Sequence, residues 1–498
     1  MSLSITGGLN PSADPAGSRT EFRGNDRLLL GIIMGVLAFW LFAQTTLNVA
    51  PDMQKDLGLD TGVMNNAVAI TALFSGIFIV FIGGLADRIG RVRVVMIGFV
   101  LSIIGSLLIG FAPNGTVAPY FLLPGRAVQG LSAACIMPAS LALVKIYWDG
   151  EARQRAVSMW SIGSWGGSGL CSLFGGFVAQ NFGWRWIFFV SVAVALVGMA
   201  LMKGTPESKA EGQSSNKFDI AGVVSFMVAM ITLQIVITQG NKLGWTSPLI
   251  LSLSAVTLVF GSLFFRVESR IPNAFVDFKL FRNQTYTGAT VSNFLLNGVA
   301  GTLLVSLQLV QLGGNMTAQQ AGMLTLGYAI AIIAFIRVGE KLLQRFGARK
   351  PMIQGCLITG LSIILLLPSN LMLADYKLFA IVGYTLYGIG LAFYATPSTD
   401  AALSSLPAAQ VASGAGLYKM ASSLGAAFGV AISAAVFTAL SANPATINWL
   451  EGVITFQGRQ ENLAIREAAI IAFAFNIFMV LIATVSIMLT VPKGKKPV

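Results

Sequence analysis

Long apolar runs separated by short polar segments make up most of the chain. Fourteen of these runs can each cross a bilayer as a helix, because a spanning helix needs roughly 20 mostly apolar residues. The pattern therefore predicts an all-α polytopic membrane protein with 14 transmembrane helices. The runs lie near 27–50, 66–86, 92–112, 119–145, 156–180, 184–202, 219–239, 248–265, 286–311, 319–339, 352–370, 376–398, 411–440 and 468–491.

The composition leads to the same class of protein. Of the 498 residues, 55% are hydrophobic and 10% are charged, whereas soluble domains carry roughly 25% charged residues. A water-soluble protein is therefore excluded. The first 26 residues are polar and rich in Gly, Ser and Pro, which predicts a disordered tail, and no removable signal peptide precedes the first run.

The cations are distributed unevenly between the two sides of the membrane. If the chain starts in the cytoplasm, 24 of the 32 Lys and Arg residues fall in cytoplasmic segments. This asymmetry predicts a multi-pass membrane protein with both termini in the cytoplasm. The net charge of +12 is then explained by loops that face anionic lipid, and it does not indicate nucleic acid as a partner.

The two halves of the chain carry a weak internal repeat. The segment "GGLADRIGRVR" at 83–93 is echoed by "GEKLLQRFGARK" at 339–350, and each lies between two apolar runs. Related halves are typical of membrane transporters. We expect two pseudo-symmetric six-helix bundles with an inserted helix pair between them. The predicted parts are a cytoplasmic tail at 1–26, the first bundle at 27–204, linkers and the inserted pair at 205–285, the second bundle at 286–492 and a cytoplasmic tail at 493–498.

The loop at 83–93 predicts a gating contact. Asp87 ends the second run at the cytoplasmic face, Gly90 permits a tight turn, and Gly83 lets another helix approach closely. A carboxylate can lie against the positive N-terminal end of a helix in the other half, a contact of roughly 0.3–1 kcal/mol that exists in only one arrangement of the halves. Arg88 and Arg91 belong to the same predicted gating motif, although for Arg91 and Arg93 setting the membrane orientation is the simpler role.

Several segments together resemble a known family. "GGLADRIGR", "PGRAVQGLSAA" and "FGWRWIFF" resemble motifs of the major facilitator superfamily, in its fourteen-helix drug:proton antiporter branch. "TALFSG", "WSIGSWGGSG", "SNFLLNGVAGT" and "YATPSTD" resemble the NorB-type quinolone efflux pumps of that branch. The resemblance implies a monomeric multidrug exporter of the bacterial cell (inner) membrane that works by alternating access, with drug-like small molecules, protons and the lipid bilayer as its partners.

Other functions stay open from the sequence. The same architecture could export an endogenous lipid-like anion such as a fatty acid, act as an uptake symporter, or serve as a non-transporting sensor. Enzyme activity is not expected, because the chain has no histidine and no paired buried carboxylates. No nucleotide-binding loop, metal site or cofactor motif is present, so no nucleotide, metal or other cofactor is expected.

Two departures from the branch leave the coupling residue undetermined. Ala43 stands where the resemblance implies an acid in the first helix, and Cys171 and Ser172 replace the Gly-Pro of the fifth-helix motif. The proton carrier of the branch is therefore missing. The remaining candidates for coupling are Arg126, Gln129, Asp400 and Glu340.

Charge inside the predicted helices is confined to Arg126 and Lys419. A cation at that depth is costly, so it usually faces water or a partner group. We hypothesise that the two make a central cavity electropositive and suited to carboxylate-bearing substrates, while hydrogen bonding to carbonyls is the alternative for Arg126. The candidates for lining the cavity are Trp40, Gln44, Asn48, Asn293, Asn297, Tyr418 and Lys419. For each Asn, a hydrogen bond between helices is the simpler interpretation.

Small residues recur at helical spacing in corresponding places of the two halves. Such patterns favour close approach of two helices, which explains them without a ligand. The glycines predicted to pack in this way are Gly163, Gly167, Gly175, Gly176, Gly425 and Gly429.

Overall fold

The computed structural model describes residues 22–148, 152, 155–156, 159–160, 162–209, 219–271, 278–406, 411–443, 447–458 and 462–493. Within these residues the chain forms helices and turns and no β-strand, which confirms the predicted all-α class. Thirteen helices in the described part are long and apolar enough to cross a membrane. The predicted run at 156–180 is the one outside this set, and its described part contains η2 (Ile162–Gly166) and α7 (Gly167–Phe182).

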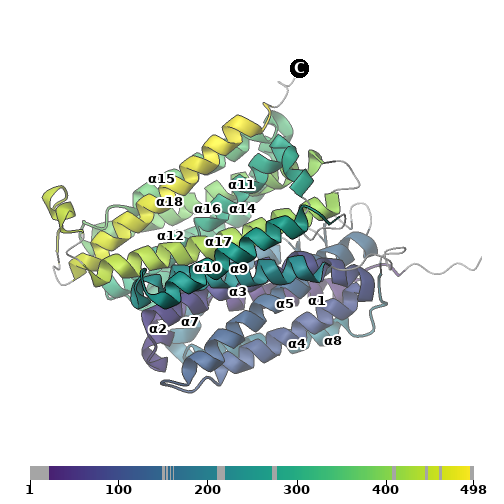
Figure 1. Cartoon of the computed structure of the whole chain (residues 1–498), viewed down its shortest axis with the longest axis horizontal. Coiled ribbons are helices and arrows are strands. Elements are labelled where there is room, and N and C mark those ends of the chain that lie inside the picture. The colour runs from purple at the N-terminus through teal and green to yellow at the C-terminus, as the bar shows by residue number, and fades with distance from the viewer. Residues whose placement is uncertain are drawn as a thin grey trace, which may run out of the picture.

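The N-terminal helices form one bundle, drawn from purple to blue in the lower half of Figure 1. Within it α5 packs against α3 and α4, α8 packs against α1 and α4, and α2 packs against α7. The remaining bounds are α1 (Asp26–Leu37), the π-helical turn η1 (Ala38–Ala43), α2 (Thr46–Leu57), α3 (Thr61–Ile89), α4 (Arg91–Gly110), α5 (Ala118–Tyr147) and α8 (Arg185–Met202).

The C-terminal helices form the second bundle, drawn in green and yellow in the upper half of Figure 1. Here α16 packs against α14 and α15, while α11, α17 and α18 pack against one another. The elements are η3 (Phe278–Arg282), α11 (Gln284–Gly298), α12 (Gly301–Gln308), the π-helical turn η4 (Leu309–Gly313), α13 (Ala318–Leu324), α14 (Leu326–Phe346), α15 (Arg349–Leu366), α16 (Leu373–Ser404), α17 (Val411–Ala442), η7 (Asn448–Gly452) and α18 (Leu463–Thr490).

The inserted pair α9 (Ile220–Leu243) and α10 (Pro248–Glu268) lies across the seam between the bundles. α9 contacts α3 of the N-terminal bundle and α17 of the C-terminal bundle, which also contact each other. Thr232 and Thr257 join the two inserted helices through their hydroxyls at 2.8 Å. The pair therefore covers the line along which the bundles meet.

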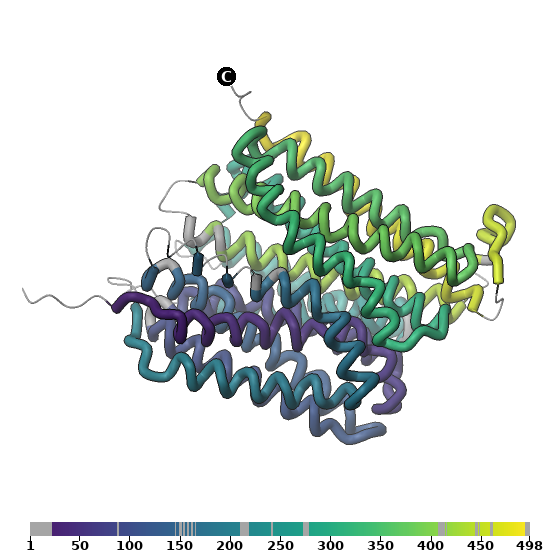
Figure 2. Tube along the Cα trace, turned by 180° about the vertical axis from the view of Figure 1, so that it is seen from behind, coloured from purple at the N-terminus to yellow at the C-terminus, as the bar shows by residue number. Residues whose placement is uncertain are grey.

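Both bundles begin with an interrupted helix. The first helix of the N-terminal bundle is α1 and α2 with the π-helical turn η1 between them, and that of the C-terminal bundle is α11 and α12 followed by η4. α1 begins and α18 ends at the same end of the molecule, at the left in Figure 2, which we name the terminal end. The other end, where η7 projects, is named the distal end.

Candidate functional site

The bundles are hydrogen-bonded to each other at the distal end. The Nδ2 of Asn48 donates to the Ser172 carbonyl in its own bundle at 2.6 Å and to the Ala318 carbonyl in the other bundle at 3.0 Å. The Nε2 of Gln311, in η4, donates back to the carbonyl and the Oδ1 of Asn48, at 3.0 and 3.2 Å. Asn48 is fully buried, so it lies inside an interbundle contact and does not face a cavity in this conformation.

Two further pairs extend this contact. The Asn65 amide donates to Thr438 Oγ1 at 2.9 Å, and the Thr317 hydroxyl donates to Gln180 Oε1 at 3.0 Å. Each pair joins the two bundles, and each lies at the distal end. We name the pairs made by Asn48, Asn65, Gln180, Gln311, Ala318, Thr317 and Thr438 the distal gate.

Glycines on α7 allow the bundles to approach here. A Cβ on Gly169 would lie 2.8 Å from the Cα of Ala329, and one on Gly322 would lie 2.5 Å from the Ser172 carbonyl oxygen. Gly176, predicted from the sequence to pack, lies directly against the backbone at Ala318. Any side chain at these positions would push the two bundles apart.

The other predicted packing glycines lie within the bundles, in corresponding places. Gly163, Gly167 and Gly175 face the first helix of the N-terminal bundle, where Gly167 would place a Cβ 3.1 Å from the Cβ of Trp40. Gly425 and Gly429 face α11, the first helix of the C-terminal bundle, against the backbone of Phe294 and Gly298. A glycine-lined face thus packs on the first helix of each bundle.

Arg126 is buried at the centre of the N-terminal bundle, with 1% of its surface exposed. Its Nη1 donates to the Ala43 carbonyl at 2.7 Å and to Gln129 Oε1 at 2.8 Å, and its Nε donates to the Ala67 carbonyl at 2.9 Å. The Nε2 of Gln129 continues the network to Ser106 Oγ at 3.3 Å. The guanidinium therefore ties the first helix to α3 and α5, which favours the structural interpretation over a role at a cavity surface.

A second polar network joins three helices of the C-terminal bundle. The Nδ2 of Asn293 donates to the Tyr418 carbonyl at 2.9 Å and to Ser422 Oγ at 2.6 Å. Asn297 donates to Asn293, and the Tyr418 hydroxyl lies 2.7 Å from Ser398 Oγ. Asn293 and Tyr418 are buried, so both connect helices in this conformation. For Asn293, a hydrogen bond between helices was the simpler interpretation from the sequence.

Lys419 differs from these groups because its side chain is exposed. Gly416 and Ser422, on the same face of α17, are half-buried, whereas Val430 and Ser433 further along that face are buried. A lipid-facing stripe would be exposed over its whole length. This face is partly open toward the terminal end, where the Cβ position of Gly416 lies 3.5 Å from Val80 of α3, and it is closed toward the distal end.

The remaining first-helix candidates are half-buried. Gln44 follows η1, and Trp40 lies within it with its indole N–H buried and without a hydrogen-bond partner among the described residues. The acids Asp400 and Glu340 are exposed in the terminal-end halves of α16 and α14. No ion pair joins either acid to a described residue.

The loop at 83–93 has one clear function in the fold. Glu207, in the segment after α8, accepts hydrogen bonds from the backbone N–H groups of Val92 and Arg93 at 2.9 and 3.1 Å. It thereby caps the positive N-terminus of α4. Gly90 has a φ of +122°, and a Cβ there would lie 2.6 and 2.7 Å from the Glu207 carboxylate oxygens. Arg91 donates to Ser208 Oγ at 2.9 Å, so the whole segment is held against α4.

The predicted gating contact concerns side chains outside the described part. Asp87 and Arg88 belong to the last turn of α3, but their side chains are not among those described. Gly83 faces Pro138 of α5, with its Cβ position 3.6 Å from the proline Cβ. The role of Asp87 therefore stays a prediction.

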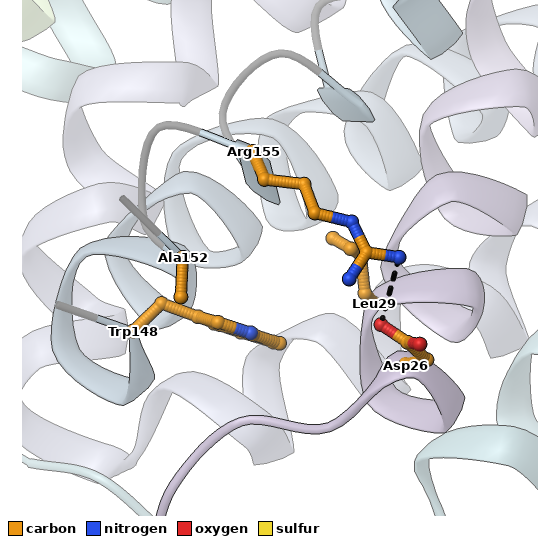
Figure 3. A pocket seen from close by; sticks show the side chains of 5 residues that line it. All are labelled: Asp26, Leu29, Trp148, Ala152 and Arg155. Carbon is orange, nitrogen blue, oxygen red and sulfur yellow. Dashed lines mark ion pairs between the residues drawn. The ribbon is translucent and has the colours of Figure 1, made fainter. Parts of the chain in front are cut away.

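A pocket of about 370 Å³ opens at the terminal end of the N-terminal bundle (Figure 3). Leu29 and the buried Trp148 line it, together with Ala152 and an ion pair between Arg155 and Asp26 at 3.3 Å. Both charged side chains are mostly exposed, so the ion pair is weak, roughly 0–1 kcal/mol, and a ligand can separate it. The pocket offers an indole and two opposite charges to a solute on that side.

Sequence reasoning missed Glu207, Gln311 and Asn65. Glu207 is the one acid in the segment 203–209, and its isolation among cations was a usable signal. Gln311 and Asn65 are ordinary polar residues near helix ends, and only the docking of the bundles gives them partners.

Comparison with known proteins identifies related chains. A family model described as Major Facilitator Superfamily matches residues 28–270 and 285–497. The Quinolone resistance protein NorB of Staphylococcus aureus (strain MRSA252) is 49% identical over 480 residues, which cover 96% of this chain and 98% of that protein. The protein of the same name from strain JH9 is 52% identical over 428 residues, covering 85% and 91%.

Solved structures share the fold at low identity. The POT family transporter PepTSo is 15% identical with a TM-score of 0.65, covering 93% of this chain and 98% of that one. A D-xylose-proton symporter is 15% identical with a TM-score of 0.62, covering 95% and 99%. At this identity the likeness concerns the fold alone.

Proposed function

The chain belongs to the major facilitator superfamily, and from that premise we propose that it exports drug-like amphipaths, quinolones among them. It is a multi-pass protein of the bacterial cell membrane and a transporter of small molecules, not an enzyme. The observation that carries the proposal is the 49% identity to a quinolone resistance protein over 96% of this chain. That similarity favours efflux over the fatty-acid exporter, symporter and sensor considered from the sequence.

The orientation and the working cycle belong to the proposal. With both termini in the cytoplasm, the distal gate closes the external side, and the open face of α17 leads to the cytoplasm. The pump works as a monomer, and it alternates between this arrangement and one in which the distal gate separates. The interbundle hydrogen bonds of Asn48 and Gln311 support this assignment.

Lys419 lines the substrate path in this proposal and favours substrates that carry a carboxylate. Its side chain is exposed on a face of α17 where Gly416 and Ser422 are also accessible. Arg126 is not a second cation of the path, because its N–H groups donate to Ala43, Ala67 and Gln129. The electropositive character of the path therefore rests on Lys419.

Everted membrane vesicles test both the pump and its selectivity. A zwitterionic quinolone and cationic ethidium are supplied to wild type and to Lys419→Gln, with Lys341→Gln as the control because Lys341 is exposed on α14. We expect the Lys419 variant to lose quinolone uptake into vesicles several-fold more than ethidium uptake. An equal loss of quinolone and ethidium uptake would exclude Lys419 as a determinant of selectivity. If wild type shows no gradient-dependent uptake, the proposed efflux function is wrong.

Protons drive the exchange in this proposal, and Asp400 is the first candidate carrier. It is exposed in α16 without an ion-pair partner among the described residues. Asp87, Glu340 and the carboxylate of the substrate are the alternatives. We expect Asp400→Asn to abolish efflux driven by a pH gradient in proteoliposomes while substrate binding remains. Unchanged pH-driven efflux would remove Asp400 from the candidates.

A further inference from the structure

A second cavity, of about 200 Å³, lies at the distal end of the C-terminal bundle. Three separate parts of the chain form it: the end of the first helix of this bundle, the turn between α15 and α16, and the segment that leads into α18. The last of these belongs to the long segment between α17 and α18. The cavity is lined by Leu309, Val310, Gly313, Gly314, Ser369, Leu371, Met372, Leu373, Tyr376, Gln457, Gly458 and Arg466.

A buried cation forms one wall of this cavity. Arg466 is 7% exposed. Its Nε donates to the Ser369 carbonyl at 2.6 Å and its Nη2 to the Leu371 carbonyl at 3.1 Å. The guanidinium carbon also lies 5.3 Å from the centre of the Phe456 ring. These contacts hold the guanidinium in one place, so its orientation is set before any ligand binds.

The rest of the cavity is mostly apolar. Leu309, Val310 and Leu373 contribute side-chain surface, and Met372, 48% exposed, stands at the rim. Tyr376 directs its hydroxyl to the Leu366 carbonyl at 3.2 Å, so its ring adds further apolar wall. A fixed guanidinium in the wall of a mostly apolar hollow matches a molecule with an anionic head and a short apolar chain.

The cavity adjoins the distal gate through η4. Leu309, Val310 and Gly313 of this five-residue turn line the cavity. Gln311 of the same turn donates to Asn48 of the other bundle. Asn462, just before α18, also donates to the Gly313 carbonyl. Whatever fills the cavity therefore packs against the back of a gate element.

We propose that this cavity binds an anionic amphipath, with its head on Arg466 and its chain against Leu309 and Leu373. The head is a carboxylate or a phosphate ester, and it comes from a free solute or from an anionic lipid. Occupation supports η4 in the position seen here and so holds the distal gate together. This regulatory consequence rests on the proposed efflux function, whereas binding itself does not.

Binding is tested on the full-length protein in nanodiscs of zwitterionic lipid. Octanoate, octanol and octylammonium share one chain and differ in head charge, so each is titrated while thermal unfolding is followed. We expect octanoate alone to raise the unfolding temperature. Arg466→Gln should weaken its apparent affinity by about tenfold or more, as loss of a charge-assisted hydrogen bond implies. Lys377→Gln, at the same end but outside the cavity lining, should not.

Variants that spare Arg466 keep the test decisive if Arg466→Gln does not fold. A Cβ on Gly313 would lie 3.4 Å from Leu309 Cδ1 and 4.0 Å from Arg466 Cγ, so Gly313→Ala fills space without strain. We expect Gly313→Ala and Met372→Ala each to weaken octanoate binding several-fold. Equal responses to all three probes would overturn the proposal. So would octanoate binding that Lys419→Gln abolishes and the cavity variants leave intact.

A lipid arm identifies the source of the anion. Nanodiscs containing phosphatidylglycerol are compared with zwitterionic ones, without octanoate. If phosphatidylglycerol raises the unfolding temperature only when Arg466 is present, and octanoate then has no further effect, the site belongs to a lipid. If phosphatidylglycerol leaves the unfolding temperature unchanged, the site belongs to a free solute. In vesicles, octanoate should slow drug efflux by wild type more than by Gly313→Ala. If the protein does not export drugs, this efflux measurement gives no signal, and the binding measurements still test the cavity.

Discussion

Arg126 and Lys419 carry the same charge inside predicted helices, yet their surroundings differ completely. The guanidinium is bonded to three helices and the ammonium is exposed. A planar guanidinium with several donors can satisfy carbonyls on different helices at once, which an ammonium does less well. Ala43, where the family resemblance led us to expect an acid, accepts one of these bonds through its backbone. A carboxylate is thus not required there to satisfy the arginine.

This arrangement predicts that Arg126 acts mainly on stability. Arg126→Ala removes the donors to the Ala43 carbonyl and to Gln129 Oε1, and each buried group left unsatisfied costs about 1–3 kcal/mol. We expect a clearly lower unfolding temperature for the purified variant, with partial recovery in Arg126→Lys. Normal stability combined with lost proton-coupled efflux would instead assign Arg126 to coupling.

At the scale of elements, the repeat seen in the sequence becomes a repeat of helix contacts. The glycine faces of α7 and α17 each pack on the first helix of their bundle, and both first helices contain a π-helical turn. In the helix-linking loop at 83–93, the N-terminus of α4 is capped by Glu207, which accepts a hydrogen bond from the backbone N–H of Val92. A glycine in this loop matters only where another group approaches it.

Two glycines of the same loop separate these effects. Gly90→Ala places a Cβ against the Glu207 carboxylate and into a backbone conformation that costs of order 1–3 kcal/mol for other residues. Gly84→Ala meets no described atom within 4 Å. We expect the first variant to unfold at lower temperature and the second to match wild type. Equal unfolding temperatures would show that the Glu207 cap contributes little.

At the scale of the whole molecule, the two bundles are held by polar pairs at one end and by helix packing along α3 and α17. A Cβ on Gly76 would lie 3.0 Å from the Leu424 side chain. In the proposed cycle the bundles pivot along this seam while the distal gate opens and closes. The inserted pair, in contact with both α3 and α17, lies over that pivot.

Asn48→Ala should shift the balance of conformations. It removes the donor to the Ala318 carbonyl and the side-chain acceptor of Gln311, while Gln311 keeps its bond to the backbone carbonyl of residue 48, so the closed gate loses about 1–3 kcal/mol of support. Spin labels at Phe182 and Met323, which are exposed on α7 and α13 at opposite sides of the gate, should report a larger share of long distances. Asn297→Ala, which removes an amide bonded within α11, is the control. An unchanged distance distribution would exclude Asn48 from the gate.

The sequence by itself determined the class of this protein. Apolar runs of bilayer length, the cation asymmetry and the repeated loop led to a helical membrane transporter, because these features depend only on local length, charge and periodicity. The family resemblance was carried by local motifs in the same way. The six glycines were predicted to pack for the same reason, since small residues at helical spacing lie on one face of a helix.

Only the tertiary structure decided which polar residues meet. Asn48 was one candidate for the cavity, with a hydrogen bond between helices as the simpler interpretation, and it lies in the distal gate. Arg126 was a coupling candidate and ties helices together, and Glu207 was not singled out yet caps α4. Each of these partners is distant in the chain, and hydrogen bonds depend on distances of about 3 Å that no local pattern specifies. An Asn or Arg in a helix has the same sequence signature whether it faces water, a carbonyl or the opposite bundle, and the docking of the bundles selects among these surroundings.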